Sequence, residues 1–326
     1  MSVIISLIIP VYNNAVYLKD CLNSVKSQSF SQFEAILIND GSEDASLDIC
    51  ESCAAEDDRF VIINQQHQGV SQARNSGIKA AQGQYLAFAD ADDILMPTML
   101  EELYSAAKLK GADIVSCAFR LIEPQMRDEF FRLAPELQEE PHSKRVMRLI
   151  HEHPIYNSMW NKLYSAELIE SREIAVPEGI VIGEDSLFNL MAYYYSRNSV
   201  YLDKVLYIYN YRQGSAIHTK ENQSNRLALL AKRCELAQVL NIKESAFASL
   251  AEQFYSLLGS EFNKIALPEL LKGISRARLS KANKDAYNLV WLRLYPLSKQ
   301  LAQFKFRAQR KYKHIVKIIS LKVGKK

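Results

Sequence analysis

The sequence has few cysteines and no apolar run long enough to cross a membrane. Its 326 residues include five cysteines, which are too few and too scattered for a disulfide framework. Cys50 and Cys53 form a C-x-x-C pair inside a helical pattern, so we interpret them as part of a helix face in preference to a redox or zinc site. The longest early apolar run, VIISLIIPV, has about half the length of a membrane span. These features predict a cytoplasmic protein with reduced thiols.

The sequence also lacks the glycine-rich loops that bind phosphate in many nucleotide-binding proteins. None of its eleven glycines forms a G-x-G, and no G-K-[ST] follows a glycine-rich loop. The dinucleotide fingerprint and the P-loop are therefore excluded. If a nucleotide binds, a metal ion must provide much of the binding to its phosphates.

Acidic residues are absent after Asp285, where eleven basic residues follow, although the whole chain has a formal net charge of only +3. Between these basic residues, the apolar and aromatic residues Tyr312, Ile315, Ile319 and Val323 recur at helical spacing. A basic amphipathic helix of this kind is suited to an anionic membrane surface. A solvated helix or a disordered tail is the alternative, and the confinement of the basic residues to one appendage argues against nucleic acid. We expect peripheral attachment to the inner face of the cell membrane.

Short apolar runs alternate with helical periodicity over the first 120 residues. The runs are SVIISLIIPVY, FEAILIND, FVIINQ, YLAFAD and DIVSCAF, and a helical segment between the third and fourth ends at Gly83. This alternation predicts an α/β fold with a doubly wound, mostly parallel sheet flanked by helices. We expect this domain to cover residues 1–220, followed by a mainly α-helical region over residues 221–326.

Clustered carboxylates follow the fourth apolar run, in YLAFADADDILMP. Asp90, Asp92 and Asp93 repel one another and resist desolvation, so the cluster predicts a bound cation. Ligands of doubly wound sheets bind outside the carboxyl ends of the strands, where these residues and Asp40 are expected. Carboxylate oxygens suit Mg²⁺ or Mn²⁺. The sequence therefore predicts a metal and ligand site at this edge of the sheet.

Four segments resemble family 2 glycosyltransferases, the inverting, nucleotide-sugar-dependent enzymes of the GT-A fold, here of the type that builds bacterial surface polysaccharides. They are SLIIPVYNN, LINDGSEDAS, QGVSQARNSGIKAAQGQYLAFADADD and GEDSLFN. The resemblance is dense over residues 3–120 and looser to about residue 220. It implies that residues 1–120 bind the nucleotide sugar and that residues 121–220 form the acceptor side.

The resemblance implies a donor site in the first 120 residues. Its Asp40 would accept a hydrogen bond from N3–H of uracil, where cytosine has an acceptor instead, which favours UDP over CDP. Both dTDP and GDP stay open, and a turn role for Asp40 in NDGS does not compete with base binding. Asp92 is the first choice for holding Mn²⁺ or Mg²⁺. The donor-binding residues implied are Pro10, Tyr12, Asp40, Arg74, Asp90, Ala91 and Asp92.

Inverting transfer requires a base that takes the proton of the acceptor hydroxyl. Glu184 and Asp185 match the E-D pair of the family, which implies that Asp185 is the base and that Glu184 positions it. The alternative is a pair of first-turn charges favoured by a helix dipole. His218 in YRQGSAIH lies where related enzymes place a histidine at the metal or the diphosphate, so we expect a metal ligand there. The other five histidines are interpreted as structural or exposed.

Trp160 and Lys162 in MWNKLY are candidates for the acceptor site, because an aromatic face stacks on sugar rings; burial of Trp160 in the core is the alternative. The predicted function is transfer of a sugar from a UDP-sugar to a glycan acceptor. That acceptor is expected to be lipid-linked, in capsule, lipopolysaccharide or exopolysaccharide synthesis.

Two other functions stay open. A sugar nucleotidyltransferase shares the architecture and the metal, but needs an early glycine-rich loop bearing Arg or Lys, which PVYNNAVYL does not provide. A non-catalytic sugar-nucleotide-binding protein would keep the donor site without turnover.

Overall fold

The computed structural model describes residues 2–123, 129–138, 154–180 and 182–211, together with the single residues 229, 232, 233 and 236. The chain divides into two compact units, Met1–Asn222 and Gln223–Lys326. The fold described below is that of the first unit. The predicted helical region over residues 221–326, including the basic tail, lies outside the described residues except for those four.

Four parallel strands form the first half of one sheet, in the order β3-β2-β1-β4. β2 is buried at every position and β1 at all but one, so neither shows the alternation of a half-exposed strand. Such continuous apolar runs are typical of parallel strands covered on both faces. The strands are β1 (Ile5–Val11), β2 (Phe33–Asp40), β3 (Phe60–Gln65) and β4 (Tyr85–Phe88).

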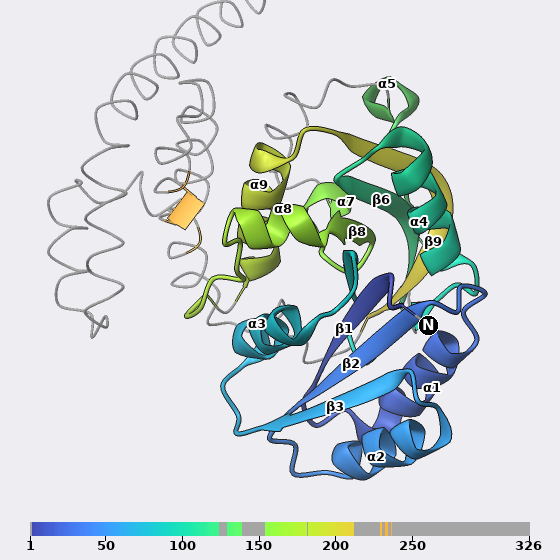
Figure 1. The fold of residues 1–326 in the computed structure, drawn as a ribbon, viewed down its shortest axis with the longest axis vertical. Helices are drawn as coiled ribbons and strands as arrows, with labels where there is room; N and C mark the ends of the chain where they lie inside the picture. Colours follow the sequence, from blue (N-terminus) through green and yellow to red (C-terminus); the bar gives the residue numbers. More distant parts are fainter. Residues whose placement is uncertain are drawn as a thin grey trace, which may run out of the picture. The chain divides into compact units, whose positions relative to one another are not determined.

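Helices cover both faces of these strands. The chain moves outward from β1 to β3 and then returns to β4, and right-handed crossovers therefore place α1 and α2 on one face and α3 on the other (Figure 1). The helices are α1 (Ala15–Lys26), α2 (Ser46–Glu56) and α3 (Val70–Ala80). Cys50 and Cys53 are buried free thiols in α2, as the helix-face interpretation predicted.

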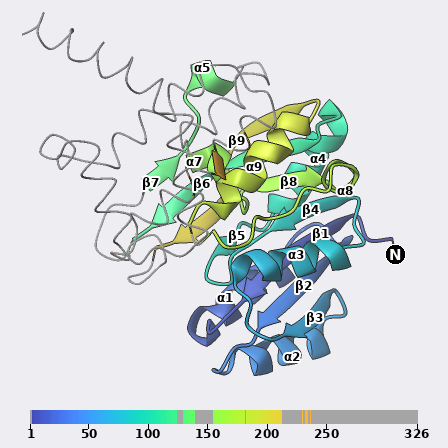
Figure 2. The same ribbon diagram turned by 90° about the vertical axis from the view of Figure 1, so that its left-hand side faces the viewer.

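The second half of the sheet is mixed. β8 (Lys162–Ser165) lies between β4 and β6 (Ile114–Ile122) and pairs antiparallel with both (Figure 2). β9 (Ser199–Asn210) pairs parallel with β6 and antiparallel with β5 (Ile94–Leu95). The predicted α/β class with flanking helices is confirmed. The run DIVSCAF, however, becomes β6 two places from β4, because a later segment inserts between them.

Short elements complete the described structure. β7 (Glu129–Phe131) pairs with β6, and α4 (Met99–Lys110) is followed by Gly111 in the left-handed conformation. No helix in the part of the chain that the structure describes has the length and hydrophobicity of a membrane span. The remaining helices are α5 (Pro135–Gln138), α7 (Pro154–Asn157), α8 (Ala166–Ser171) and α9 (Glu184–Tyr195).

Candidate functional site

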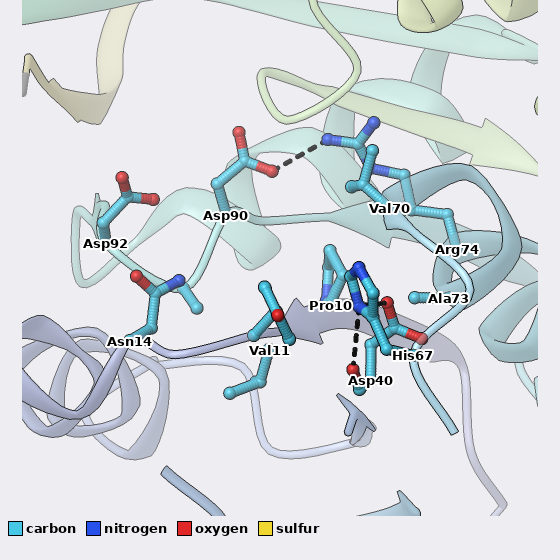
Figure 3. Close-up of a pocket in the computed structure, with 12 residues that line it drawn as sticks. Pro10, Val11, Asn14, Asp40, His67, Val70, Ala73, Arg74, Asp90 and Asp92 are labelled. Atoms are coloured by element: carbon cyan, nitrogen blue, oxygen red, sulfur yellow. Dashed lines mark hydrogen bonds and ion pairs between the residues drawn. The ribbon is translucent and has the colours of Figure 1, made fainter. Parts of the chain in front are cut away.

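A pocket of about 270 Å³ opens outside the carboxyl ends of β1, β2 and β4 (Figure 3). This is the edge at which doubly wound sheets bind ligands. All seven residues predicted for the donor site line it, together with five others. The lining residues are Pro10, Val11, Tyr12, Asn14, Asp40, His67, Val70, Ala73, Arg74, Asp90, Ala91 and Asp92. The structure thus brings the predicted donor residues together, while their individual roles stay predictions.

Asp40 ends β2 and is only 2% exposed. Its Oδ1 accepts hydrogen bonds from Gln65 Nε2 at 2.7 Å and from the backbone N–H of Gln68 at 3.0 Å. Its Oδ2 accepts from the backbone N–H of Gly69 at 2.8 Å and lies 2.9 Å from Nδ1 of His67. Asp40 therefore holds the loop between β3 and α3 against the end of β2.

Tyr12 and His67 form a stacked pair at the same end of the pocket. Their ring centroids are 4.0 Å apart and their planes differ by 21°. Sequence analysis did not single out His67, because one histidine among polar residues carries no motif of its own. Its position directly before the family segment beginning QGVS is the signal that could have identified it.

Arg74 joins the two acidic motifs of the site. It is buried on α3, and its guanidinium donates to Asp90 Oδ1 at 2.9 Å and to Glu184 Oε1 at 2.8 Å. Burial opposes its charge, but the Asp90 and Glu184 carboxylates raise the pKa of Arg74 above its usual value. Within the described residues its buried Nε has no hydrogen-bond partner.

Glu184 and Asp185 begin α9, after Gly183 in the left-handed conformation. Burial raises the pKa of Asp185 to about 7; the charge of Glu184 adds to the increase and Arg74 opposes it. Asp185 Oδ1 accepts from the backbone N–H of Ser186 at 2.8 Å. The ion pair of Glu184 with Arg74 connects the start of α9 to the pocket. Charges that served only the helix dipole would not need such a partner.

Asp93 faces the protein and not the pocket. It is fully buried; its Oδ2 accepts from the hydroxyl of Tyr207 at 2.7 Å and its Oδ1 from the backbone N–H of Asn210 at 2.8 Å. The backbone N–H of Asp90 donates to the same tyrosine oxygen, and Asn210 Nδ2 donates to the carbonyl of Asp92. Burial, and then the Asp90 charge, raise the pKa of Asp93 well above its usual value. The expectation that all three carboxylates face a cation is therefore wrong for Asp93, which ties the motif to β9.

The position of Asp92 is compatible with a metal ion that is coordinated mainly by the phosphates of a bound nucleotide. Its side chain lies apart from the Asp90–Arg74 pair in Figure 3, and it is half-buried at the pocket. Among the described residues there is no cluster of three or more His, Cys, Asp or Glu side chains able to hold an ion. Mg²⁺ commonly binds one or two carboxylates plus substrate phosphates, so a single protein carboxylate is compatible. His218 lies outside the described residues, and its metal role stays a prediction.

Trp160 is packed into an aromatic cluster and is 8% exposed. It stacks on Tyr207 at 4.5 Å and on Tyr209 at 5.5 Å, and meets Phe119 edge to face at 4.6 Å. These contacts match the core alternative for Trp160. Its acceptor role stays a prediction.

Lys162 is fully buried in β8. Its Nζ donates to the carbonyl of Ile155 at 2.7 Å, to the carbonyl of Ser158, and to Asn161 Oδ1 at 2.8 Å. Burial lowers the pKa of Lys162 to about 7, although three oxygen acceptors match the three N–H groups of the charged form. A contact between Lys162 and an acceptor sugar would require this network to open.

Comparison with known protein families matches residues 6–172 to the family described as glycosyl transferase family 2. The uncharacterized glycosyltransferase EpsJ of Bacillus subtilis is 36% identical over 217 residues, which cover 64% of this chain and 61% of EpsJ. The chain therefore spans about three fifths of the length of that curated relative.

Two solved structures share the fold. The structure of Staphylococcus aureus TarS 1–349 with UDP-GlcNAc superposes with a TM-score of 0.66 at 22% identity, covering 89% of this chain and 82% of that one. The mannosyltransferase PcManGT of Pyrobaculum calidifontis, in complex with GDP-Man and Mn²⁺, superposes with a TM-score of 0.54 at 16% identity, covering 90% of this chain and 86% of that one. At these identities the likeness concerns the fold, and it confirms the predicted fold class.

Proposed function

The chain belongs to glycosyltransferase family 2, and from this premise we propose that it transfers a sugar from a nucleotide-sugar donor to a glycan acceptor in surface polysaccharide synthesis. The observation that carries the proposal is the pocket, which gathers Asp40, Arg74 and the Asp90–Asp92 motif at the carboxyl ends of three strands. UDP is favoured over CDP, because the Asp40 carboxylate would accept a hydrogen bond from an N–H of the base, and dTDP and GDP stay open.

Different residues of the pocket would bind the base and the diphosphate of the donor. Asp40 and Tyr12 would hold the base, and Asp92 would hold a divalent ion at the diphosphate. Such an ion, when bound, stabilises the charge that develops on the leaving diphosphate. Arg74 keeps Asp90 and Glu184 in place through its two ion pairs. Diphosphate leaves without protonation, so the site needs no second acid.

Asp185 would accept the proton of the attacking acceptor hydroxyl. A base works best when its pKa lies near the working pH, and burial beside Glu184 provides this for Asp185. The assignment is supported by the position of Asp185 at the start of α9, next to Glu184, which pairs with Arg74 of the pocket lining.

This assignment predicts an acidic limb in the pH profile. The base must be deprotonated, so log(kcat/KM) should rise with pH up to the raised pKa of Asp185, at about 7, and level off above it. Steady-state rates between about pH 5.5 and about pH 8 test this. Lys162 has a pKa of about 7 as well, so its titration would give a limb at the same pH. The pH profile of the residual activity of Asp185→Asn is therefore the control, and it should lack the limb. A profile of the unsubstituted protein that is flat over this range would contradict the base assignment.

The proposed function itself is tested with a panel of nucleotide sugars. We expect one donor to stabilise the full chain against heating when Mn²⁺ or Mg²⁺ is present and to lose this effect with a chelator. UDP-GlcNAc and Mn²⁺ are tried first, since TarS was solved with UDP-GlcNAc and PcManGT with Mn²⁺. Transfer to an acceptor confirms the enzyme. Binding without turnover favours the non-catalytic alternative, and release of diphosphate from UTP and a sugar phosphate favours the nucleotidyltransferase.

A lipid-linked acceptor and attachment to the membrane belong to the same proposal and rest on the basic tail. Deletion of residues 304–326 should leave turnover on a soluble acceptor nearly unchanged, because the proposed catalytic residues lie earlier in the chain. It should reduce binding to anionic vesicles, since each basic residue near the surface contributes about 1 kcal/mol. Co-sedimentation with anionic and neutral vesicles measures this. Equal binding by both proteins would remove the argument for a membrane-borne acceptor.

A further inference from the structure

The imidazole of His67 lies where the proposed function requires a nucleobase. Its ring centroid lies 4.0 Å from that of Tyr12, on which it stacks. Its Nδ1 is 2.9 Å from Asp40 Oδ2 and 3.1 Å from the Asp40 carbonyl oxygen (Figure 3). Both of these oxygens only accept hydrogen bonds, so Nδ1 must carry the hydrogen. A planar ring that stacks on Tyr12, with its N–H on the Asp40 carbonyl oxygen and next to the Asp40 carboxylate, occupies the position expected of the base.

The carboxylate of Asp40 has no room for a further donor while His67 is in place. Its two oxygens provide about four acceptor positions, of which Gln65, Gln68 and Gly69 fill three. Nδ1 of His67, at 2.9 Å from Oδ2, stands at the remaining position while it hydrogen-bonds the Asp40 carbonyl oxygen. Two of these donors are backbone N–H groups. Gln65 is held in addition by Ser76, whose hydroxyl donates to Gln65 Oε1 at 2.7 Å. His67 is the donor that can leave, because its side chain is 52% exposed.

We propose that the His67 imidazole holds the nucleobase position in the ligand-free protein and that the base of the donor displaces it. The inference rests on the proposed function, and it specifies how that site opens. The base that replaces the imidazole must present an N–H to Asp40. Uracil, thymine and guanine have such a group, whereas cytosine and adenine have an acceptor at the corresponding ring nitrogen.

The displacement needs only a side-chain rotation. The backbone on the C-terminal side of His67 is held by the Gln68 and Gly69 hydrogen bonds to Asp40. On the other side it packs against Gly41, where a Cβ atom would come within 2.7 Å of the His67 backbone nitrogen. Gly41 has a φ of +71° as well, so both its conformation and its contact favour glycine. The loop is therefore fixed, and the half-exposed imidazole is its movable part.

The imidazole that occupies the base position lowers the apparent affinity for the donor, because only the fraction of ligand-free molecules with the imidazole rotated away can bind it. Removing the side chain removes this competition. We expect His67→Ala to bind UDP about 2- to 13-fold more tightly, the factor expected for one aromatic contact or one net hydrogen bond. The exposed position makes loss of folding an unlikely source of any difference, and thermal unfolding of the variant checks it.

Calorimetric titration of the full chain with UDP, at one fixed Mn²⁺ concentration, measures the effect, with GDP and dTDP titrated in parallel. Gln66→Ala is the matched control, since this neighbour on the same loop is exposed and does not line the pocket. Its affinity should equal that of the unsubstituted protein. Equal or weaker binding by His67→Ala would overturn the inference, because a histidine that contacts the base would lower affinity when removed.

A second measurement follows the imidazole directly. In protein labelled with ¹⁵N-histidine, the Nδ1 resonance of His67, assigned by its loss in His67→Ala, should change on addition of UDP as the hydrogen bond to Asp40 breaks. An unchanged resonance at saturating UDP contradicts the displacement. If the unsubstituted chain binds none of the three nucleotides, the proposed function fails and the inference fails with it. If it binds and His67→Ala does not bind more tightly, only the inference fails.

Discussion

Asp185→Asn should lower turnover by about 10²- to 10⁴-fold, the usual contribution of a positioned base, while the affinity for UDP stays close to that of the unsubstituted protein. Asparagine has nearly the same shape and can still accept the hydrogen bond from the backbone N–H of Ser186. It cannot take a proton from the acceptor hydroxyl. The substitution therefore removes the proton transfer and leaves the start of α9 in place.

Single-turnover rates with saturating donor and a soluble acceptor, together with calorimetric titration of UDP, separate the two effects. Asp58→Asn is the control, because it removes the charge of an exposed aspartate on the connection between α2 and β3. It should change neither quantity. A collapse of UDP affinity in Asp185→Asn would make Asp185 a donor or metal ligand, and Glu184 would become the first candidate for the base.

Asp92→Ala should abolish most of the metal-dependent activity, by about 10²-fold or more, because Lewis-acid stabilisation of the leaving diphosphate is worth several kcal/mol. The fold should survive. The bond from Asn210 goes to the backbone carbonyl of Asp92, which alanine retains. Removing one of several clustered carboxylates also relieves repulsion.

Titration of UDP binding against Mn²⁺ concentration measures the change. The unsubstituted protein should bind UDP more tightly as Mn²⁺ rises, and Asp92→Ala should lose most of this dependence. Asp58→Ala is the control for removal of a carboxylate and should keep the response. An unaltered Mn²⁺ response in Asp92→Ala would show that the ion, if it binds, is held elsewhere.

The parallel half of the fold could be predicted because each of its signals is local. The unbroken apolar runs of β1 and β2 identify buried strands without reference to any other part of the chain. The rule that ligands bind at the carboxyl ends of such strands then placed Asp40 and Asp90 in one pocket. These inferences need no knowledge of distant contacts.

The strand order of the mixed half could not be predicted, because it depends on contacts between distant segments. MWNKLY looks like a polar loop, since lysine is rarely buried without partners. Lys162 lies inside β8 because carbonyl oxygens from the preceding residues surround its Nζ. Asp93 likewise differs from Asp92 only through Tyr207 and Asn210, more than 100 residues away in the sequence. No pattern within the motif distinguishes the two aspartates.

The insertion of β8 between β4 and β6 has a consequence for synthesis on the ribosome. β4 ends at Phe88, but its neighbour on that side is Lys162–Ser165, which emerges about 75 residues later. At about 5 to 20 residues per second, the edge of β4 stays unpaired for about 4 to 15 s. An open edge next to apolar strands can pair with other nascent chains. We therefore expect the open edge of β4 to bind a chaperone during translation.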